Sequence, residues 1–125
     1  SKGCVVLITT DAARFPTTGE SVIGAVGASV ILMTKTLGRE FSRANIRINS
    51  VAMTLTSDTP SWDRIFNNDE FERKVFSKAL DRFPQKRAPT ADEVAAVAAF
   101  LASDEAAQIT GQTVSVNGGL SFGGW

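Results

Sequence analysis

The side chains that could do chemistry in this sequence are hydroxyls and carboxylates, because the 125 residues contain no histidine, no tyrosine and one cysteine, Cys4. Histidine is the usual general base and metal ligand, and tyrosine donates protons in several hydride-transfer enzymes. A lone thiol without histidine lacks the partner that activates it as a nucleophile or completes a metal site. The residue types therefore leave few enzymatic reactions open, and we expect no metal site.

The charge balance points away from polyanionic partners. Thirteen basic residues balance thirteen acidic residues, and like charges form no run, so we expect no nucleic acid and no membrane surface as partner. A single cysteine cannot form an internal disulfide, and the first residues lack the pattern of a targeting sequence. We expect one domain over residues 1–125 and a cytoplasmic location.

Two apolar segments flank a long helical pattern, and these elements would have to position any functional side chain. Residues 4–10 (CVVLITT) and 46–52 (IRINSVA) are typical of buried strands. Residues 22–41 between them predict a helix. A strand, a long helix and a second strand form a βαβ unit, whose strands are parallel.

The predicted helix at 22–41 is apolar on more than one side. Residues 22–33 carry no charge, and an apolar row continues at steps of three and four: Val26, Val30, Met33, Leu37 and Phe41. The uncharged stretch is too short for a bilayer, which takes about 20 residues. We expect a core helix that is covered on more than one side, either by its own fold or by a second chain.

The segment 54–84 is polar and contains two shorter helical patterns, at 61–66 and 69–83. Each has an apolar edge, formed in turn by Trp62 with Phe66 and by Phe71, Val75, Phe76 and Leu80. These side chains either pack the segment onto the body of the fold or make the segment a lid over a substrate. Both interpretations remain open.

One more helix and strand complete the pattern. Thr90 and Glu93 form a T-x-x-E capping box, in which each side chain pairs with a backbone N–H at the helix start. An apolar face follows at Val94, Val97, Ala98 and Leu101. Residues 113–116 predict the third strand, before a glycine-rich tail.

The segment FLASDEAAQITGQTVSVNGG, residues 100–119, closely resembles a pattern that ends chains of the short-chain dehydrogenase/reductase family, FLASDxAxxITGQxxxVDGG. Residues 46–52 are similar to the family's IRVNSVAPG, and residues 34–37 (TKTL) also agree. The resemblance covers the whole chain but only the second half of the family's usual length. It implies an α/β fold, the C-terminal half of a Rossmann-type doubly wound parallel sheet with three strands and flanking helices. The glycine-rich turn that seats the dinucleotide diphosphate belongs to the other half.

The resemblance also assigns the family's catalytic positions. The family uses a Tyr-x-x-x-Lys motif near the start of the long helix, where Tyr transfers a proton and Lys supports it and holds the ribose. Ile23 and Gly27 occupy these positions, and neither can transfer a proton or bear a charge. The family's substrate-polarising serine corresponds to Thr10, whose hydroxyl could equally cap a backbone group at the strand end.

The nicotinamide end of the family's cofactor site corresponds to residues after the second strand. The family's Pro-Gly falls on Met53 and Thr54, and its cofactor-contacting threonine falls on Asp58, beside Thr59. An acidic residue there suits a dinucleotide diphosphate poorly. We expect no cofactor for this chain alone, and NAD or NADP if another chain completes the site.

Three functions remain open. The first is a dehydrogenase-like subunit that is not catalytic by itself and acts in assembly. The second is an NAD(P)-dependent oxidoreductase whose cofactor site and acid/base come from another chain or an upstream segment. The third is a small-molecule binding module with residues 62–83 as a lid.

We expect that the chain does not exist as a free monomer. An apolar edge strand promotes aggregation unless it is covered, so we expect homo- or hetero-oligomeric contacts through the strand at 4–10 and the helix at 22–41. Small residues four apart on that helix would let another helix approach closely: Gly24 with Ala28, and Ala25 with Ser29.

Overall fold

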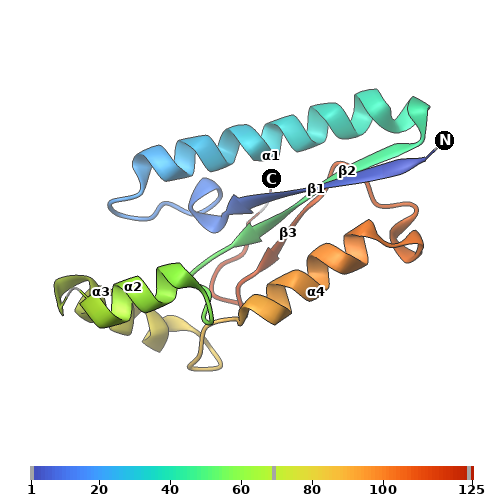
Figure 1. Ribbon diagram of the computed structural model, residues 1–125. Helices are drawn as coiled ribbons and strands as arrows, with labels where there is room; N and C mark the ends of the chain where they lie inside the picture. The colour runs from blue at the N-terminus through green and yellow to red at the C-terminus, as the bar shows by residue number, and fades with distance from the viewer. Residues whose placement is uncertain (1, 69, 124) are drawn as a thin grey trace.

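A parallel sheet of three strands runs through the centre of the computed structural model, which describes residues 2–68, 70–123 and 125 (Figure 1). Strand β1 (Gly3–Thr10) pairs with β2 (Ile46–Met53), and β2 pairs with β3 (Thr113–Val116). The order β1-β2-β3 places β1 at one edge and β3 at the other. The predicted strands and their parallel arrangement are confirmed.

One long helix covers each face of the sheet. Helix α1 (Ser21–Phe41) lies on one face and α4 (Ala91–Ala102) on the other, as predicted (Figure 1). The capping box of α4 is also confirmed, since Thr90 Oγ1 accepts from the N–H of Glu93 and Glu93 Oε1 accepts from the N–H of Thr90. The buried core on the α4 side centres on three residues: Val51, Val94 and Leu101.

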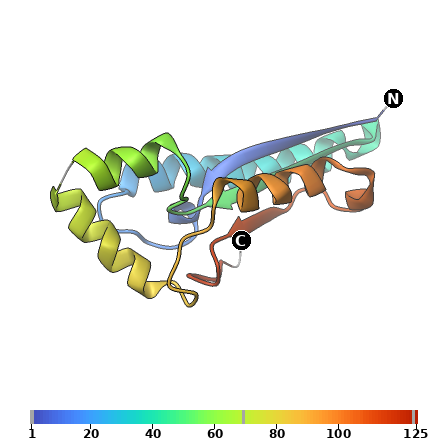
Figure 2. The same ribbon diagram turned by 60° about the horizontal axis from the view of Figure 1, so that its bottom comes forward.

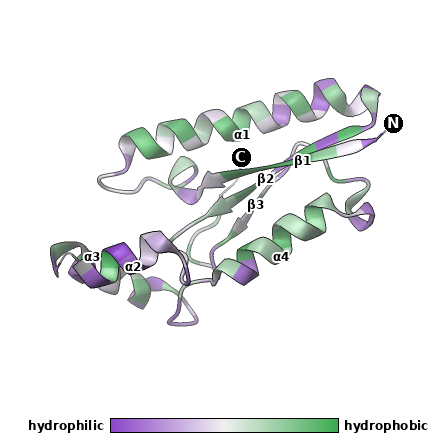
Figure 3. Cartoon of the chain, in the orientation of Figure 1, coloured by the Kyte–Doolittle hydropathy of each residue, from purple (hydrophilic) through white to green (hydrophobic). Residues whose placement is uncertain are grey.

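The face of α1 that contacts the sheet is not the predicted apolar row. The buried residues of this helix follow steps of three and four, and three of the five are glycines: Gly24, Gly27, Ile31, Thr34 and Gly38. Apart from Ile31, most of the larger apolar side chains point outward, and Val26 is 60% exposed. Most of α1 accordingly carries the green of hydrophobic residues in Figure 3. Within the described residues, the outer side of the helix is left uncovered by its own chain.

Glycine occurs on this buried face where the backbone of a neighbouring turn comes too close to α1 for a side chain. A Cβ atom on Gly24 would lie 2.7 Å from the carbonyl oxygen of Ala12, and one on Gly38 would lie 2.7 Å from Cα and N of Gly111. Real Cβ atoms do not approach other atoms so closely. The expectation that Gly24 admits a helix from another chain was therefore wrong, because Ala12 of the same chain occupies that space.

Helices α2 (Pro60–Asn68) and α3 (Glu70–Arg82) pack against each other at one end of the molecule (Figure 2). The rings of Trp62 and Phe66 lie 4.4 Å apart, whereas Phe71 is 76% exposed. The aromatic that anchors this segment to the body is Phe83, which is fully buried just after α3. The predicted lid role for residues 54–84 stays a prediction, and residue 69 lies outside the described residues.

Three short 3₁₀ turns complete the chain: η1 (Asp11–Ala13) after β1, η2 (Ser42–Ala44) after α1, and η3 (Asp104–Ala106) after α4. The turn η2 ends at Asn45, whose φ of +59° is left-handed, a conformation that asparagine tolerates better than most residues. This turn reverses the chain directly into β2.

Candidate functional site

The end of β1 and the start of α1 meet at the candidate catalytic positions. Thr9 Oγ1 donates a 2.9 Å hydrogen bond to the carbonyl oxygen of Gly27, and Gly27 itself is buried. A Cβ atom on Gly27 would lie 2.5 Å from Cγ2 of Thr10, 3.0 Å from Oγ1 of Thr9 and 3.1 Å from Cβ of Ala13. The space that any side chain at position 27 needs is therefore already filled by the chain's own atoms.

The hydroxyl of Thr10 caps the backbone. Thr10 Oγ1 accepts a 3.1 Å hydrogen bond from the N–H of Ala12, which begins the turn η1. This is the strand-end cap that the sequence allowed for this hydroxyl. The cap fixes the rotamer that directs Cγ2 of Thr10 toward Gly27.

Ile23 lies one helical turn before Gly27 and is 56% exposed. Residues four apart share a helix face, so the two positions stand together as the resemblance implies. An isoleucine and a glycine offer no donor, acceptor or charge in their side chains. Neither position therefore offers a polar side-chain group beside Thr10.

The four candidate cofactor positions lie in two places. Met53 and Thr54 lie at the end of β2, and Asp58 and Thr59 lie just before α2. Met53 pairs with Thr10 at the C-terminal ends of β2 and β1, the edge where ligands bind in open parallel sheets. Thr54 follows, and its carbonyl oxygen accepts a hydrogen bond from Oγ1 of Thr56. The sheet therefore brings Thr10 and Met53 together, as the aligned positions require.

Asp58 and Thr59 instead build the start of α2. Thr59 Oγ1 donates to the carbonyl oxygen of Thr56 at 2.9 Å and accepts from the N–H of Trp62 at 3.1 Å, which caps the helix. Asp58 is exposed, and its backbone adopts the left-handed conformation, with a φ of +61°. The structure gives Thr59 a capping role and places Asp58 in the turn before the helix.

A buried polar network beside this site was not predicted. The carboxylate of Asp11 accepts from Oγ of Ser115 at 2.6 Å and from Nδ2 of Asn117 at 2.7 Å, and Arg14 donates to Oγ of Ser115 at 2.9 Å. Asn117 Nδ2 also donates to the carbonyl oxygen of Ser121. More than 100 residues separate Asp11 from its partners, so sequence spacing carries no signal for the network.

A parallel sheet with helices on both faces, and with its candidate site at the C-terminal ends of the strands, defines half of a doubly wound α/β fold. The comparisons make the class specific. A family model described as enoyl-(acyl carrier protein) reductase matches residues 1–121. The chain belongs to the short-chain dehydrogenase/reductase family.

Three similar proteins illustrate the match. The chain is 36% identical over 118 residues to 3-oxoacyl-[acyl-carrier-protein] reductase FabG of Thermotoga maritima, covering 94% of this chain and 45% of that protein. It is 37% identical over 120 residues to L-xylulose reductase of Caenorhabditis elegans, covering 96% and 46%. A crystal structure of Cj0485 dehydrogenase, 24% identical, superposes with a TM-score of 0.86 over 94% of this chain and 45% of that one, which supports the fold. The chain spans about half the length of these curated relatives.

The family implies NAD or NADP, but the catalytic positions of this chain do not fit the ribose and nicotinamide end of such a cofactor. A lysine that holds the ribose would have to start at Gly27, where Cγ2 of Thr10 blocks the Cβ position. The exposed Asp58 adds negative charge where the family has a neutral threonine. The mismatch lies in residues that this chain itself supplies.

Metal binding and membrane insertion are two further properties on which the described residues bear. In residues 2–68, 70–123 and 125, no group of three or more His, Cys, Asp or Glu side chains is placed to hold a metal ion. By length and composition alone, Ser21–Ala44 would be long and apolar enough to cross a membrane. The glycine face of α1 packs on the sheet, however, which is the arrangement of a core helix in an α/β fold.

Proposed function

We propose that this chain is a cytoplasmic member of the short-chain dehydrogenase/reductase family that contributes structure and subunit contacts and supplies no acid/base group for hydride transfer. The observation that carries the proposal is the closed space at Gly27, where the chain's own Thr10 stands 2.5 Å from the Cβ position. Both aligned catalytic positions lie inside this chain, so residues added before it would not restore them. General acid/base catalysis typically contributes about 10²–10⁴-fold in rate.

A cofactor titration tests this proposal. NADH and NADPH fluorescence should show no saturable change with the purified chain, and a panel of ketone and thioester substrates should give no oxidation of either nucleotide. Thermotoga maritima FabG serves as the positive control in the same buffer. Saturable binding near one nucleotide per chain, or turnover above the control without protein, would overturn the proposal.

A second candidate is an NAD(P)-dependent oxidoreductase that another polypeptide or an upstream segment completes. Its support is the β1 edge, where Val5 and Ile8 are both about half exposed and no strand pairs on the outer side within the described residues. The length of the relatives also supports it, since this chain covers 45% of FabG. In this case the acid/base would come from the other segment.

Reconstitution separates the two candidates. The N-terminal half of a related reductase, ending after its fourth strand, would be co-expressed with this chain and the complex assayed with NADPH. An inactive, stable complex supports the structural role. Turnover that falls on Thr10→Ala would support the oxidoreductase, because Thr10 is the one aligned catalytic position that keeps a polar group.

We further propose that the chain is oligomeric through the outer face of α1 and the β1 edge. Both are apolar and exposed, and such surfaces on one molecule usually mark contacts with another. Multi-angle light scattering of the purified chain at micromolar concentration should give a mass above the 13.3 kDa of one chain. A stable monomer at that concentration would contradict the proposal.

A further inference from the structure

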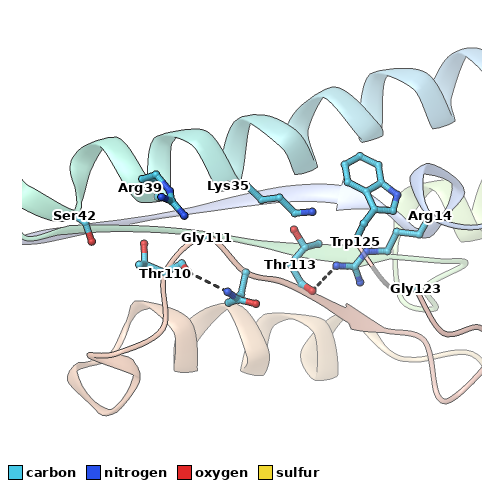
Figure 4. A pocket seen from close by; sticks show the side chains of 11 residues that line it. Arg14, Lys35, Arg39, Ser42, Thr110, Gly111, Thr113, Gly123 and Trp125 are labelled. Carbon is cyan, nitrogen blue, oxygen red and sulfur yellow. Dashed lines mark hydrogen bonds between the residues drawn. The ribbon is translucent and has the colours of Figure 1, made fainter.

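An open cavity of about 700 Å³ lies between α1, the turn before β3 and the C-terminal tail (Figure 4). Its α1 wall lies in the C-terminal half of that helix, and Lys35 in this wall is 12 residues, about 18 Å at 1.5 Å per residue, from Ile23. Arg14, by contrast, comes four residues after Thr10. The cavity lies toward β3, at the opposite edge of the sheet from β1. Its size is within the range of small-molecule sites, about 300–1,000 Å³.

The charged side chains that line this cavity are all positive. Lys35 and Arg39 stand one helical turn apart on α1, and Arg14 enters from the turn after η1 (Figure 4). No Asp or Glu is among the described residues that line the cavity. Among the described residues, the two ion pairs are Lys2–Asp104 and Arg87–Glu93, so none of these three cations is neutralised by a direct partner.

The guanidinium of Arg14 is held in place before any ligand arrives. It donates to Oγ of Ser115 at 2.9 Å and to the carbonyl oxygen of Thr113 at 2.6 Å. The C-terminal tail passes close to the aliphatic part of the Arg14 side chain, since a Cβ atom on Gly123 would lie 2.5 Å from Cδ of Arg14. Its Nε is buried and has no hydrogen-bond partner. The carboxylate of Asp11 is linked to this guanidinium through the hydroxyl of Ser115, which donates to Asp11 at 2.6 Å.

The other two cations are free to contact an anion. The hydrogen bonds of the described residues include none from Nζ of Lys35 or from the guanidinium of Arg39, and both residues are exposed. Lys35 Nζ lies 4.8 Å from the ring centroid of Trp125, a cation–π contact at the end of the cavity. This contact positions the ammonium without neutralising it.

We propose that the cavity binds a small molecule that carries a diphosphate group. Arginine and lysine are the side chains that recognise phosphate, through charge-assisted hydrogen bonds. Three cations from two walls match the charge of a diphosphate better than that of a single phosphate. The proposal is independent of hydride transfer, because none of its residues lies at the aligned catalytic or cofactor positions.

Trp125 provides the signal for a direct test, because the chain has two tryptophans and the other is Trp62 in α2. In a Trp62→Phe variant, inorganic pyrophosphate should change the Trp125 emission saturably at constant ionic strength. Sodium sulfate at the same ionic strength should not reproduce the change. No response in the folded variant, or an equal response to sulfate, would overturn the proposal.

Charge variants in the same Trp62→Phe background locate the site. Lys35→Met and Arg39→Met should each weaken pyrophosphate binding about tenfold, because each removes one charge-assisted contact from an exposed helix position. Lys78→Met on α3 is the matched control and should leave the affinity unchanged. Equal affinities in all three variants would contradict the proposed site.

The titration is repeated at two protein concentrations. An affinity that is independent of protein concentration supports a small-molecule site. A Trp125 signal that follows protein concentration and ignores pyrophosphate would mean that a second copy covers the cavity, which would overturn the proposal.

Discussion

Gly27 and Thr10 are in contact so close that a single added Cβ atom on Gly27 would lie 2.5 Å from Cγ2 of Thr10. Thr10 cannot turn away without cost, because its Oγ1 is hydrogen bonded to the N–H of Ala12. The two positions that align with the family's lysine and serine therefore pack directly on each other. Under the proposed function, this contact is structural and takes no part in catalysis.

The first prediction concerns this contact. Gly27→Ala should destabilise the chain by about 1–3 kcal/mol, because overpacking outweighs the gain of about 1 kcal/mol that alanine usually brings to a helix. Thr10→Ser removes Cγ2 but keeps the capping oxygen, so Thr10→Ser/Gly27→Ala should recover part of the loss. Urea unfolding followed by circular dichroism measures the three variants.

Gly38→Ala is the matched control for that rescue. Its Cβ atom would lie 2.7 Å from backbone atoms of Gly111, so no side-chain truncation nearby can make room. It should destabilise the chain, and Thr10→Ser should not relieve it. A Gly27→Ala variant as stable as the parent chain would show that β1 and α1 move apart easily, contrary to the proposal for function.

Much of the framework could be predicted from sequence because local patterns determine it. The β-branched run at 4–10 and the capping box at Thr90 each identified an element that the structure contains. Which side of α1 faces the sheet could not be predicted in this way. Periodicity selects the largest apolar side chains, such as Val26, whereas the close approach of β1 and the neighbouring turns to α1 selects glycines.

The candidate site was also predictable only in part from the sequence. The alignment identified Thr10, Ile23 and Gly27 as neighbours, and the structure places Thr10 against Gly27. The contacts of Asp11 with Asn117 could not be found, because they join residues 106 positions apart and depend on how the tail folds back. Long-range polar pairing leaves no periodic trace in a single sequence.

The second prediction uses this network. The family pattern has aspartate at the position of Asn117, so Asn117→Asp is a reversion to the family residue. It should nevertheless destabilise this chain by about 2–4 kcal/mol, because it removes the Nδ2 donor and sets a second buried carboxylate against Asp11. Thermal and urea unfolding measure the loss.

The exchange variant Asp11→Asn/Asn117→Asp tests the cause. It restores one amide and one carboxylate with their roles reversed, so it should recover at least half of the lost stability. An exchange variant no better than Asn117→Asp alone would show that other contacts of the asparagine, such as the one to Ser121, dominate.

The third prediction concerns the start of α4. Arg87 donates to both carboxylate oxygens of Glu93, and this hydrogen bonding, followed by that from Thr90, lowers the pKa of Glu93 from 4.5 to about 2. A pKa lowered by folding stabilises the folded state above the unfolded value and loses that effect as pH falls through the folded value. Stability from this group should therefore decline between about pH 4.5 and pH 2.

Melting temperatures from pH 6 to pH 2 measure this decline. Glu93→Gln should flatten the curve in that window, since glutamine keeps an acceptor for the N–H of Thr90 but does not titrate. Glu40→Gln, an exposed carboxylate on α1, is the control and should leave the Glu93-dependent decline in place. A curve for Glu93→Gln that matches the parent chain would assign the acid sensitivity to other carboxylates.

The last prediction concerns the outer face of α1, on which the proposed assembly depends. Val26 and Leu32 are about 60% exposed and lie on the side of the helix away from the sheet. Val26→Lys and Leu32→Lys should lower the mass measured by light scattering, because a charge in an apolar subunit contact must be desolvated. Neither should unfold the chain, since lysine is a good helix former and both positions are exposed. Val75→Lys on α3 changes an exposed valine outside the proposed contact and should leave the mass unchanged. If both α1 variants assemble like the parent chain, the contact lies elsewhere, and the β1 edge becomes the surface to test with Ile8→Lys.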